Sequence, residues 1–296
     1  MVRVSRIALR GIIALAGIMA LAIALPPGTS AQMRMKKSEP TLIYVPTPQP
    51  VVDKMLEVAK VTKDDYVFDL GSGDGRIPIT AAARFGARGF GVDINPELIA
   101  EARANAKAAG VSDRVEFRQQ DLFETSVREA TVVGLYLFVW ANEKLRPRLI
   151  SELRPGSRIV AHDFPIGNDW KPDVEEGIDN RTVYLWYVPA QVAGAWTING
   201  GPPGMILQLR QQFQMIEGTA TVNGRSVPLQ KATLRGDEIE FTVALDSGKP
   251  MLFRGRVDGN TIEPRADAGA GAMTGWSAAR LASPPATVPA VIRSRG

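Results

Sequence analysis

The segment from Asp69 to Arg76, Asp-Leu-Gly-Ser-Gly-Asp-Gly-Arg, is the part of this sequence whose residue types and spacing most clearly suggest chemistry. Its closely spaced glycines allow the backbone to turn sharply and allow a ligand to approach it. The segment lies between an apolar run typical of a strand and a run typical of a helix. Because the beginning of a helix attracts negatively charged groups such as carboxylates, we expect a ligand to bind at this turn.

Two further acidic residues occupy equivalent places along the chain. Asp93 ends the next expected strand, and Asp121 follows the third, within Gln119-Gln120-Asp121-Leu122. Open α/β sheets bind their ligands at the carboxyl ends of their strands, where an acid can accept hydrogen bonds from ribose hydroxyls, as Asp93 could. Asp121 could accept a hydrogen bond from an adenine amino group. Together with Asp69, these acids predict a site for a nucleotide cofactor.

Two other interpretations of the glycine segment are open. A glycine turn between a strand and a helix can be a tight connection with no ligand. The second alternative is NAD(P), whose binding fingerprint places a third glycine five residues after the first. That position is Arg76 here, and the third glycine is Gly75. NAD(P) would also leave Asp69 without a role.

Alternating strands and helices must position these residues. The expected strands are Tyr66–Leu70, Gly89–Asp93, Arg114–Arg118, Ala130–Leu137, Arg158–Ala161 and Thr182–Val188. The expected helices begin near Val51 and cover Ile77–Phe85, Pro96–Ala109 and Glu143–Leu153. Asn95 and Pro96 are typical of a helix N-cap and first helical position. This alternation predicts an α/β fold over residues 44–190, with a Rossmann-like, mainly parallel sheet and helices on both faces.

This arrangement resembles the class I S-adenosylmethionine (SAM)-dependent methyltransferases over about half of the chain. The resemblance implies SAM as the cofactor and implies a role for each residue that matches the family pattern. Asp69 would hold the ammonium side of SAM, Gly71, Ser72 and Gly73 would pack against its methionyl part, Asp93 would bind the ribose, and Asp121 would contact adenine, with Ile94 and Leu122 flanking the ring.

A narrower similarity points to the acceptor side. Tyr44-Val45-Pro46-Thr47, Trp140-Ala141-Asn142 and His162-Asp163-Phe164 resemble a group of small bacterial and mitochondrial methyltransferases, some of which methylate protein lysines. We expect Tyr44, Trp140 and Asn142 to form the catalytic acceptor pocket, which must place the nucleophile in line with the methyl group and exclude water. His162 is expected to be a structural residue rather than a catalyst.

The character of the sequence changes near Ala193. Turn signals separate short alternating runs, which predict a C-terminal antiparallel β domain over residues 193–282, either barrel-like or a sandwich. The residues expected in its interior are Leu207, Leu209, Phe213, Ile239, Phe241, Val243 and Phe253. This domain carries no chemical signature, and residues 283–296 are expected to be a disordered tail.

Composition excludes several kinds of site. The sequence has no cysteine and one histidine, His162, which excludes disulfides, zinc–thiolate sites and cysteine nucleophiles, and we expect no metal site. The net charge is +4, from 35 basic and 31 acidic residues. Because no basic stripe runs through the middle of the chain, no nucleic-acid partner is expected.

The N-terminus is typical of a targeting segment. Arg3, Arg6 and Arg10 precede the uncharged, mostly apolar run Gly11–Leu25, and Thr29-Ser30-Ala31 offers a cleavage site before Gln32. Residues 1–31 are therefore expected to be a signal peptide or a membrane anchor, with a linker over residues 32–43. The body would be exported, either periplasmic or attached to the inner membrane, and only this segment would contact a membrane.

Two functional hypotheses follow. The first is a SAM-dependent methyltransferase whose acceptor is unidentified, either a protein, with a lysine suggested by resemblance alone, or a small molecule. The second is a non-catalytic exported binding protein that reuses the SAM-binding fold. The second arises because SAM is made in the cytoplasm, whereas the N-terminal segment directs the chain out of it.

Overall fold

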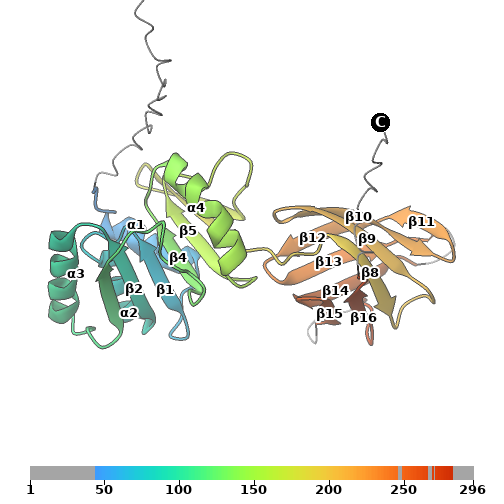
Figure 1. Ribbon diagram of the computed structural model, residues 1–296. Coiled ribbons are helices and arrows are strands. Elements are labelled where there is room, and N and C mark those ends of the chain that lie inside the picture. The colour runs from blue at the N-terminus through green and yellow to red at the C-terminus, as the bar shows by residue number, and fades with distance from the viewer. Residues whose placement is uncertain (1–43, 246–248, 266–268, 270, 283–296) are drawn as a thin grey trace, which may run out of the picture. The chain divides into compact units, whose positions relative to one another are not determined.

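A computed structural model describes residues 44–245, 249–265, 269 and 271–282. The expected leader (residues 1–31), linker (32–43) and tail (283–296) lie outside the described residues. The described chain contains a seven-stranded sheet, called sheet A, followed by a nine-stranded sheet, called sheet B. Figure 1 shows sheet A in blue to yellow-green and sheet B in yellow to red.

Sheet A is mainly parallel, with the strand order β3-β2-β1-β4-β5-β7-β6. Its strands are β1 (Tyr66–Leu70), β2 (Arg88–Asp93), β3 (Val115–Gln119), β4 (Val132–Leu135), β5 (Arg158–His162), β6 (Val174–Ile178) and β7 (Arg181–Tyr187). β1 to β5 pair in parallel, whereas β7 runs antiparallel to both β5 and β6. The parallel strands therefore present their carboxyl ends at one edge, as the sequence predicted.

Helices cover both faces of sheet A. They are α1 (Gln49–Val58), α2 (Arg76–Phe85), α3 (Pro96–Ala108) and α4 (Val139–Glu152). Successive strand residues point to opposite faces, so Val67 packs with α1 and α2, while Phe68 belongs to the core under α4. Each described helix falls short of the length and apolarity that a bilayer crossing requires.

Local signals explain where α3 begins. The Asn95 side chain accepts a hydrogen bond of 2.8 Å from the Glu97 N–H, and Pro96 occupies the first turn. An N-cap oxygen satisfies one of the unpaired N–H groups that every helix start exposes. This N-cap fixes the end of the β2–α3 connection, which carries Asp93 and Ile94.

Sheet B is antiparallel and nearly closed, with the strand order β11-β10-β9-β8-β16-β15-β14-β13-β12. Its strands are β8 (Gly194–Asn199), β9 (Ile206–Gln212), β10 (Met215–Val222), β11 (Arg225–Pro228), β12 (Gln230–Arg235), β13 (Glu238–Val243), β14 (Met251–Asp258), β15 (Thr261–Pro264) and β16 (Ser277–Arg280). This is the barrel-like alternative of the two that the sequence left open.

Aromatic side chains fill the interior of sheet B. Trp196, Trp276, Phe241 and Phe253 are fully buried, and the rings of Phe241 and Phe253 stack with centroids 5.0 Å apart. Six of the seven residues expected in this interior lie there; the exception is Phe213. Phe213 instead packs against the core of sheet A, because it lies in the turn between β9 and β10 rather than in a strand.

Candidate functional site

The loop between β1 and α2 holds the glycines singled out in the sequence. Gly71, Gly73 and Gly75 have φ angles of +89°, +52° and +81°, in the left-handed region that favours glycine. The N–H groups of Gly71 and Ser72 donate to the Val92 carbonyl over 2.9 and 2.8 Å, which ties the loop to β2. The carboxyl ends of β1 and β2 are thereby joined into one edge.

Asp93 connects this loop to the start of α3. One carboxylate oxygen accepts from the Gly73 N–H over 3.1 Å, and the other accepts from the Asn95 N–H over 2.9 Å. Each carboxylate oxygen has a second lone pair, and the residue is only half-buried. Asp93 can therefore shape the loop and still accept hydrogen bonds from a ligand.

Asp69 lies at the same edge but inside the protein, with 4% of its surface exposed. Burial first, and then the negative charges of Asp93 and Asp74, raise the pKa of Asp69 from 3.8 to about 8. All of the charges that act on this carboxyl are negative. A buried acid in such surroundings is a strong candidate for a site that receives a cationic ligand.

The third expected acid lies after β3. Asp121 is exposed, and its carboxylate accepts from the Phe123 N–H over 2.7 Å, which closes the turn. Leu122 is buried and lies close to Gly71. If Gly71 carried a Cβ atom, that atom would be 3.7 Å from the Leu122 Cδ2 atom. Ile94, after β2, is 67% exposed. The structure therefore brings the β2 and β3 residues to the edge where the glycine loop lies.

These features fit the SAM expected from the sequence. SAM carries a positive sulfonium and an ammonium group, which suit the uncompensated carboxyl of Asp69, and ribose hydroxyls, which can donate to Asp93. The exposed Ile94 and the buried Leu122 supply apolar contacts of the kind that a purine ring uses. The glycines also let neighbouring side chains approach the loop closely, because the Tyr44 ring lies where a Cβ at Gly73 would be and the Phe117 ring lies 2.6 Å from a Cβ at Gly75.

Replacing Gly73 with alanine should lower SAM affinity about fivefold and reduce stability by about 1 kcal/mol. The new Cβ would clash with the Tyr44 ring, so that ring must leave the loop. Gly224→Ala is the matched control, because Gly224 also has a positive φ, of +77°, but has nothing within 4 Å of the added Cβ. Calorimetry and thermal unfolding measure both effects; equal SAM affinities in the two variants would contradict the prediction.

The segment from Tyr44 to Thr47 lies over the glycine loop. The Tyr44 side chain interacts electrostatically with Asp74, and Arg76 pairs with the Asp74 carboxylate at 2.5 Å. Arg76 also donates to the Thr47 carbonyl over 2.7 Å. Burial would raise the pKa of Asp74, but the hydrogen bonds and charge of Arg76 outweigh it and lower that pKa. Asp74 is thus compensated, whereas Asp69 is not.

Trp140 and Asn142 lie in the first turn of α4, which begins four residues earlier than the sequence suggested. Asn142 is completely buried, and its amide group donates to the carbonyls of Leu137 (3.2 Å), Phe164 (2.9 Å) and Pro165 (3.4 Å). Trp140 is partly buried beside Phe123, with ring centroids 6.1 Å apart. Asn142 therefore joins the segments that follow β4 and β5.

Three aromatic residues that were not predicted to belong to the acceptor pocket lie at the carboxyl ends of β4 and β5. They are Tyr136, Phe138 and Phe164, here called the aromatic wall. The centroid of the Phe164 ring lies 6.0 Å from that of Tyr136 and 5.5 Å from that of Phe138. Leu137, between two of them, approaches Gly71. Two signals were available in the sequence: all three residues follow strand ends, and Phe164 belongs to the His162-Asp163-Phe164 motif that carried the family resemblance.

His162 ends β5 and is fully buried. Its ring stacks on Tyr136 with centroids 3.9 Å apart, and its Nδ1 atom lies 3.3 Å from the Thr47 hydroxyl. Burial lowers the pKa of His162, although the charge of Asp163 opposes this effect. A neutral, enclosed imidazole agrees with the structural role expected for this residue.

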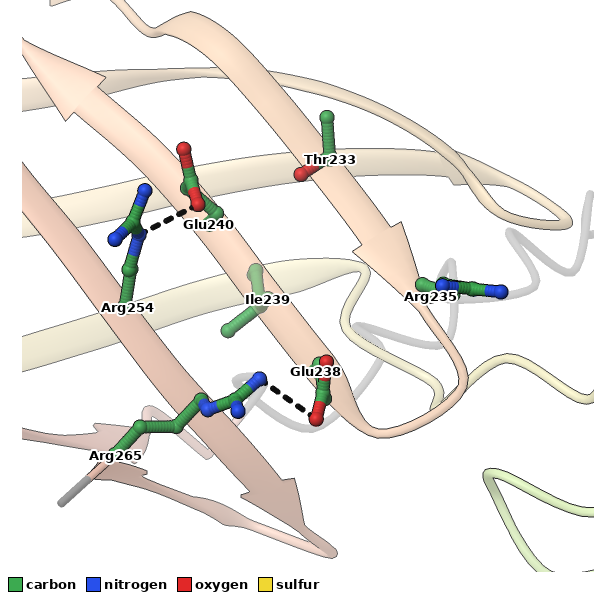
Figure 2. Close-up of a pocket in the computed structure, with 7 residues that line it drawn as sticks. All are labelled: Thr233, Arg235, Glu238, Ile239, Glu240, Arg254 and Arg265. Atoms are coloured by element: carbon green, nitrogen blue, oxygen red, sulfur yellow. Dashed lines mark hydrogen bonds and ion pairs between the residues drawn. The ribbon is translucent and has the colours of Figure 1, made fainter. Parts of the chain in front are cut away.

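A separate hollow of about 310 Å³ lies over β12, β13 and β14 (Figure 2). Arg254 pairs with Glu240 and Arg265 pairs with Glu238, each at 2.7 Å, and a third arginine of the lining, Arg235, lies 4.2 Å from the centroid of the Tyr187 ring. It contains no nucleophile–base pair. In the described parts of the chain, no three acidic or histidine side chains gather closely enough to hold a metal ion.

Known proteins match the part of the chain that forms sheet A. Residues 69–174 match the family described as the ANTKMT methyltransferase domain. A protein-lysine N-methyltransferase from Saccharolobus islandicus (strain REY15A) is 49% identical over 154 residues, which cover 50% of this chain and 95% of that protein.

Two further relatives differ in what their names say they act on. An adenine nucleotide translocase lysine N-methyltransferase from Mus musculus is 39% identical over 39% of this chain and 51% of its own length. A solved structure of an RNA methyltransferase from Salinibacter ruber, in complex with S-adenosyl-L-homocysteine, is 55% identical and covers 50% of this chain and 96% of that one, with a TM-score of 0.49. These relatives match at most about half of this chain.

Proposed function

This chain belongs to the class I SAM-dependent methyltransferases, and on that premise we propose that it transfers the methyl group of SAM to the ε-amine of a lysine in a protein. The observation that carries the proposal is the similarity to the protein-lysine N-methyltransferase from Saccharolobus islandicus. The two sequences are 49% identical, and the match covers 95% of that protein. The mouse relative is likewise named for a lysine acceptor.

SAM supplies a methyl group on a positively charged sulfur, which is an excellent leaving group. The protein therefore has to bind SAM and the acceptor, orient them and exclude water, rather than form a covalent intermediate. We assign the ammonium end of SAM to Asp69, with Gly71, Ser72 and Gly73 along its methionyl part. We assign the ribose to Asp93. Adenine would contact Asp121, between Ile94 and Leu122.

The acceptor amine must be neutral to attack, although a free lysine has a pKa of about 10.4. We assign the acceptor pocket to the aromatic wall together with Tyr44 and Trp140. Aromatic faces attract an incoming ammonium group, and an apolar enclosure lowers the pKa of a lysine because it disfavours the charged form. Phe138 and Tyr44 are 41% and 42% exposed, which leaves them accessible to a substrate.

In this arrangement Asn142 acts as a positioning residue. Its buried amide joins Leu137, next to the aromatic wall, to the carbonyls that follow β5. Replacing Asn142 with alanine should lower kcat about tenfold and stability by about 1–3 kcal/mol, because three carbonyls lose a buried donor. SAM affinity should change less than threefold. Unchanged turnover in a folded Asn142→Ala protein would contradict this role.

The acceptor class can be tested with methyl-labelled SAM. The full-length protein is incubated separately with total protein and with total RNA from its source cells, and labelled proteins are digested and analysed by mass spectrometry. We expect label on lysine side chains. Label confined to RNA, to another amino acid or to small molecules would refute the lysine proposal.

We further propose that residues 1–31 direct the chain out of the cytoplasm, to the periplasm or the inner membrane. The support is the order of basic, apolar and small residues in this segment. The mass of the N-terminal peptide, measured on protein purified from source cells, tests the proposal. Mature protein beginning at Gln32 supports cleavage, and intact protein in the membrane fraction supports an anchor. Intact protein in the cytoplasm refutes export.

A further inference from the structure

The turn between β9 and β10 connects sheet B to the core of sheet A. Phe213 and Gln214 form this turn, and Phe213 packs with the sheet A core. The Phe213 ring stacks on Trp170 with centroids 5.2 Å apart and an interplanar angle of 13°. The Gln214 side chain donates to the Lys171 carbonyl over 2.6 Å. Both contacts fall on residues 163–173, here called the β5–β6 loop.

Phe213 occupies an unfavourable backbone conformation. Its φ is +52°, and two-residue hairpin turns normally place glycine, asparagine or aspartate at such positions. The turn is held by Gln211, whose amide donates to the carbonyls of Phe213 (2.7 Å) and Ala190 (2.8 Å). A bulky residue kept in a strained conformation suggests that its side chain has a function.

The β5–β6 loop carries groups from the acceptor side of the site. Phe164 belongs to the aromatic wall, and its carbonyl accepts from Asn142. Farther along, the Trp170 carbonyl accepts from the Trp186 indole N–H over 3.0 Å. Arg146 of α4 bonds to Asp169 of the loop, and its guanidinium lies 5.4 Å from the centroid of the Phe213 ring. The Phe213 ring therefore contacts both the loop and the helix that carries Asn142.

We propose that sheet B positions the acceptor side of the methyltransferase site, through the packing of Phe213 on Trp170 in the β5–β6 loop. The catalytic part of this inference rests on the proposed function; the contact itself does not. Without the ring, Trp170 loses its stacking partner and the loop becomes more mobile. The aromatic wall and the Asn142 hydrogen bonds then lose their fixed geometry, while the carboxylates of the cofactor side are unaffected.

Three full-length variants test the proposal. Phe213→Gly removes the ring and also suits the positive φ, so it does not strain the hairpin. Phe213→Tyr keeps the ring and serves as the rescue variant. Met215→Ala is the matched control, because Met215 lies in the same hairpin with 65% of its surface exposed.

Hydrogen exchange of the tryptophan indole N–H groups, followed by NMR, reports on the loop without any acceptor. We expect exchange at Trp186 to accelerate about tenfold or more in Phe213→Gly. Trp196 is the internal reference, because its indole donates to the Val192 carbonyl at the start of sheet B over 2.8 Å. The Phe213→Tyr and Met215→Ala proteins should match the wild type at both indoles.

Methyl transfer to total source-cell protein and SAM titration complete the test. Phe213→Gly should lose about fivefold or more in transfer rate, with SAM affinity within about twofold of the wild type. Unchanged Trp186 exchange in Phe213→Gly, equal acceleration in Met215→Ala, or normal transfer despite faster exchange would each overturn the inference. If the wild type labels no protein, the lysine proposal fails, and Trp186 exchange alone decides whether Phe213 holds the loop.

Discussion

Replacing Asp69 with asparagine should weaken SAM binding about 100-fold, because a charge-assisted interaction with the cationic ligand contributes up to about 3 kcal/mol. The same change should stabilise the ligand-free protein at pH 8. The pKa of Asp69 rises from 3.8 to about 8 on folding, which corresponds to at most roughly 6 kcal/mol of unfavourable free energy. We expect a gain of about 1–3 kcal/mol, because the buried amide needs partners of its own.

The sign follows from proton linkage. Between pH 3.8 and about 8 the unfolded chain has an ionised Asp69, whereas the folded chain keeps it protonated, so this group destabilises the fold increasingly as pH rises. Below pH 3.8 both states are protonated, and the variant should match the wild type. Thermal unfolding at pH 8 and near pH 4 measures the difference. A variant that is less stable than the wild type at pH 8 would contradict the assigned environment.

SAM binding should also depend on pH through Asp69. Binding a cation requires the ionised carboxylate, so affinity should rise as pH approaches 8 and then fall as the amino group of SAM loses its proton, near pH 8. Calorimetry at pH 7, in buffers of different ionisation enthalpy, should detect up to about one proton released on binding. The Asp69→Asn protein should release none.

Asp65, at the opposite end of β1, provides the matched control. Burial would raise its pKa, but hydrogen bonds from Thr131 and Thr62 and an ion pair with Arg158 at 2.7 Å lower it. A lowered pKa contributes stability above pH 4 that is lost in acid. Asp65→Asn should therefore destabilise the protein at pH 8 and leave SAM affinity unchanged. The aspartates at the two ends of β1, Asp65 just before the strand and Asp69 within it, thus have opposite effects on stability.

The cofactor side of the site could be predicted because its signals are local. Asn95 and Pro96 fix the start of α3, and the glycines fix the loop after β1, so neighbouring residues decide where Asp69 and Asp93 lie. The strands that carry these acids were placed within a residue of their observed ends. Parallel pairing then brings their carboxyl ends together, whatever the details of the remaining sheet.

The acceptor side could not be predicted in the same way. The N-cap of α4 is Phe138, which makes no side-chain hydrogen bond, so nothing in the local sequence marks a helix that begins at Val139. Trp140 and Asn142 therefore preceded the expected helix, which was placed over Glu143–Leu153. Phe213 lies in an otherwise alternating run of apolar residues, and only its contact with Trp170 reveals that it leaves the interior of sheet B.

The two sides also differ in chemistry, and this difference bears on the mechanism. Carboxyls gather around the glycine loop, where a cationic cofactor would bind, whereas aromatic side chains lie beyond β4 and β5. An acceptor that enters between aromatic rings loses water before it meets the methyl group, which favours a neutral amine. We therefore expect the pH dependence of SAM binding to come from Asp69 and that of turnover to include the acceptor amine.

Replacing Asp93 with alanine should weaken SAM binding by about 100-fold to 10,000-fold, the largest effect we expect. Two ribose hydroxyls would each lose a hydrogen bond to a charged group, worth about 1.5–3 kcal/mol apiece. The change also removes the acceptor for the Gly73 and Asn95 N–H groups, so the loop loses its connection to α3. Asp113→Ala is the control, because Asp113 is exposed and precedes β3, at the opposite edge of the sheet.

Ligand fragments separate this effect from that of Asp69. Adenosine contains the ribose but lacks the amino-acid part of SAM, so its binding, measured by competition with labelled SAM, should weaken in Asp93→Ala and not in Asp69→Asn. S-adenosylhomocysteine contains both parts and should weaken in both variants. If adenosine binds Asp93→Ala as tightly as the wild type, the ribose does not lie at Asp93. The orientation proposed for the cofactor along the ends of β1, β2 and β3 would then be wrong.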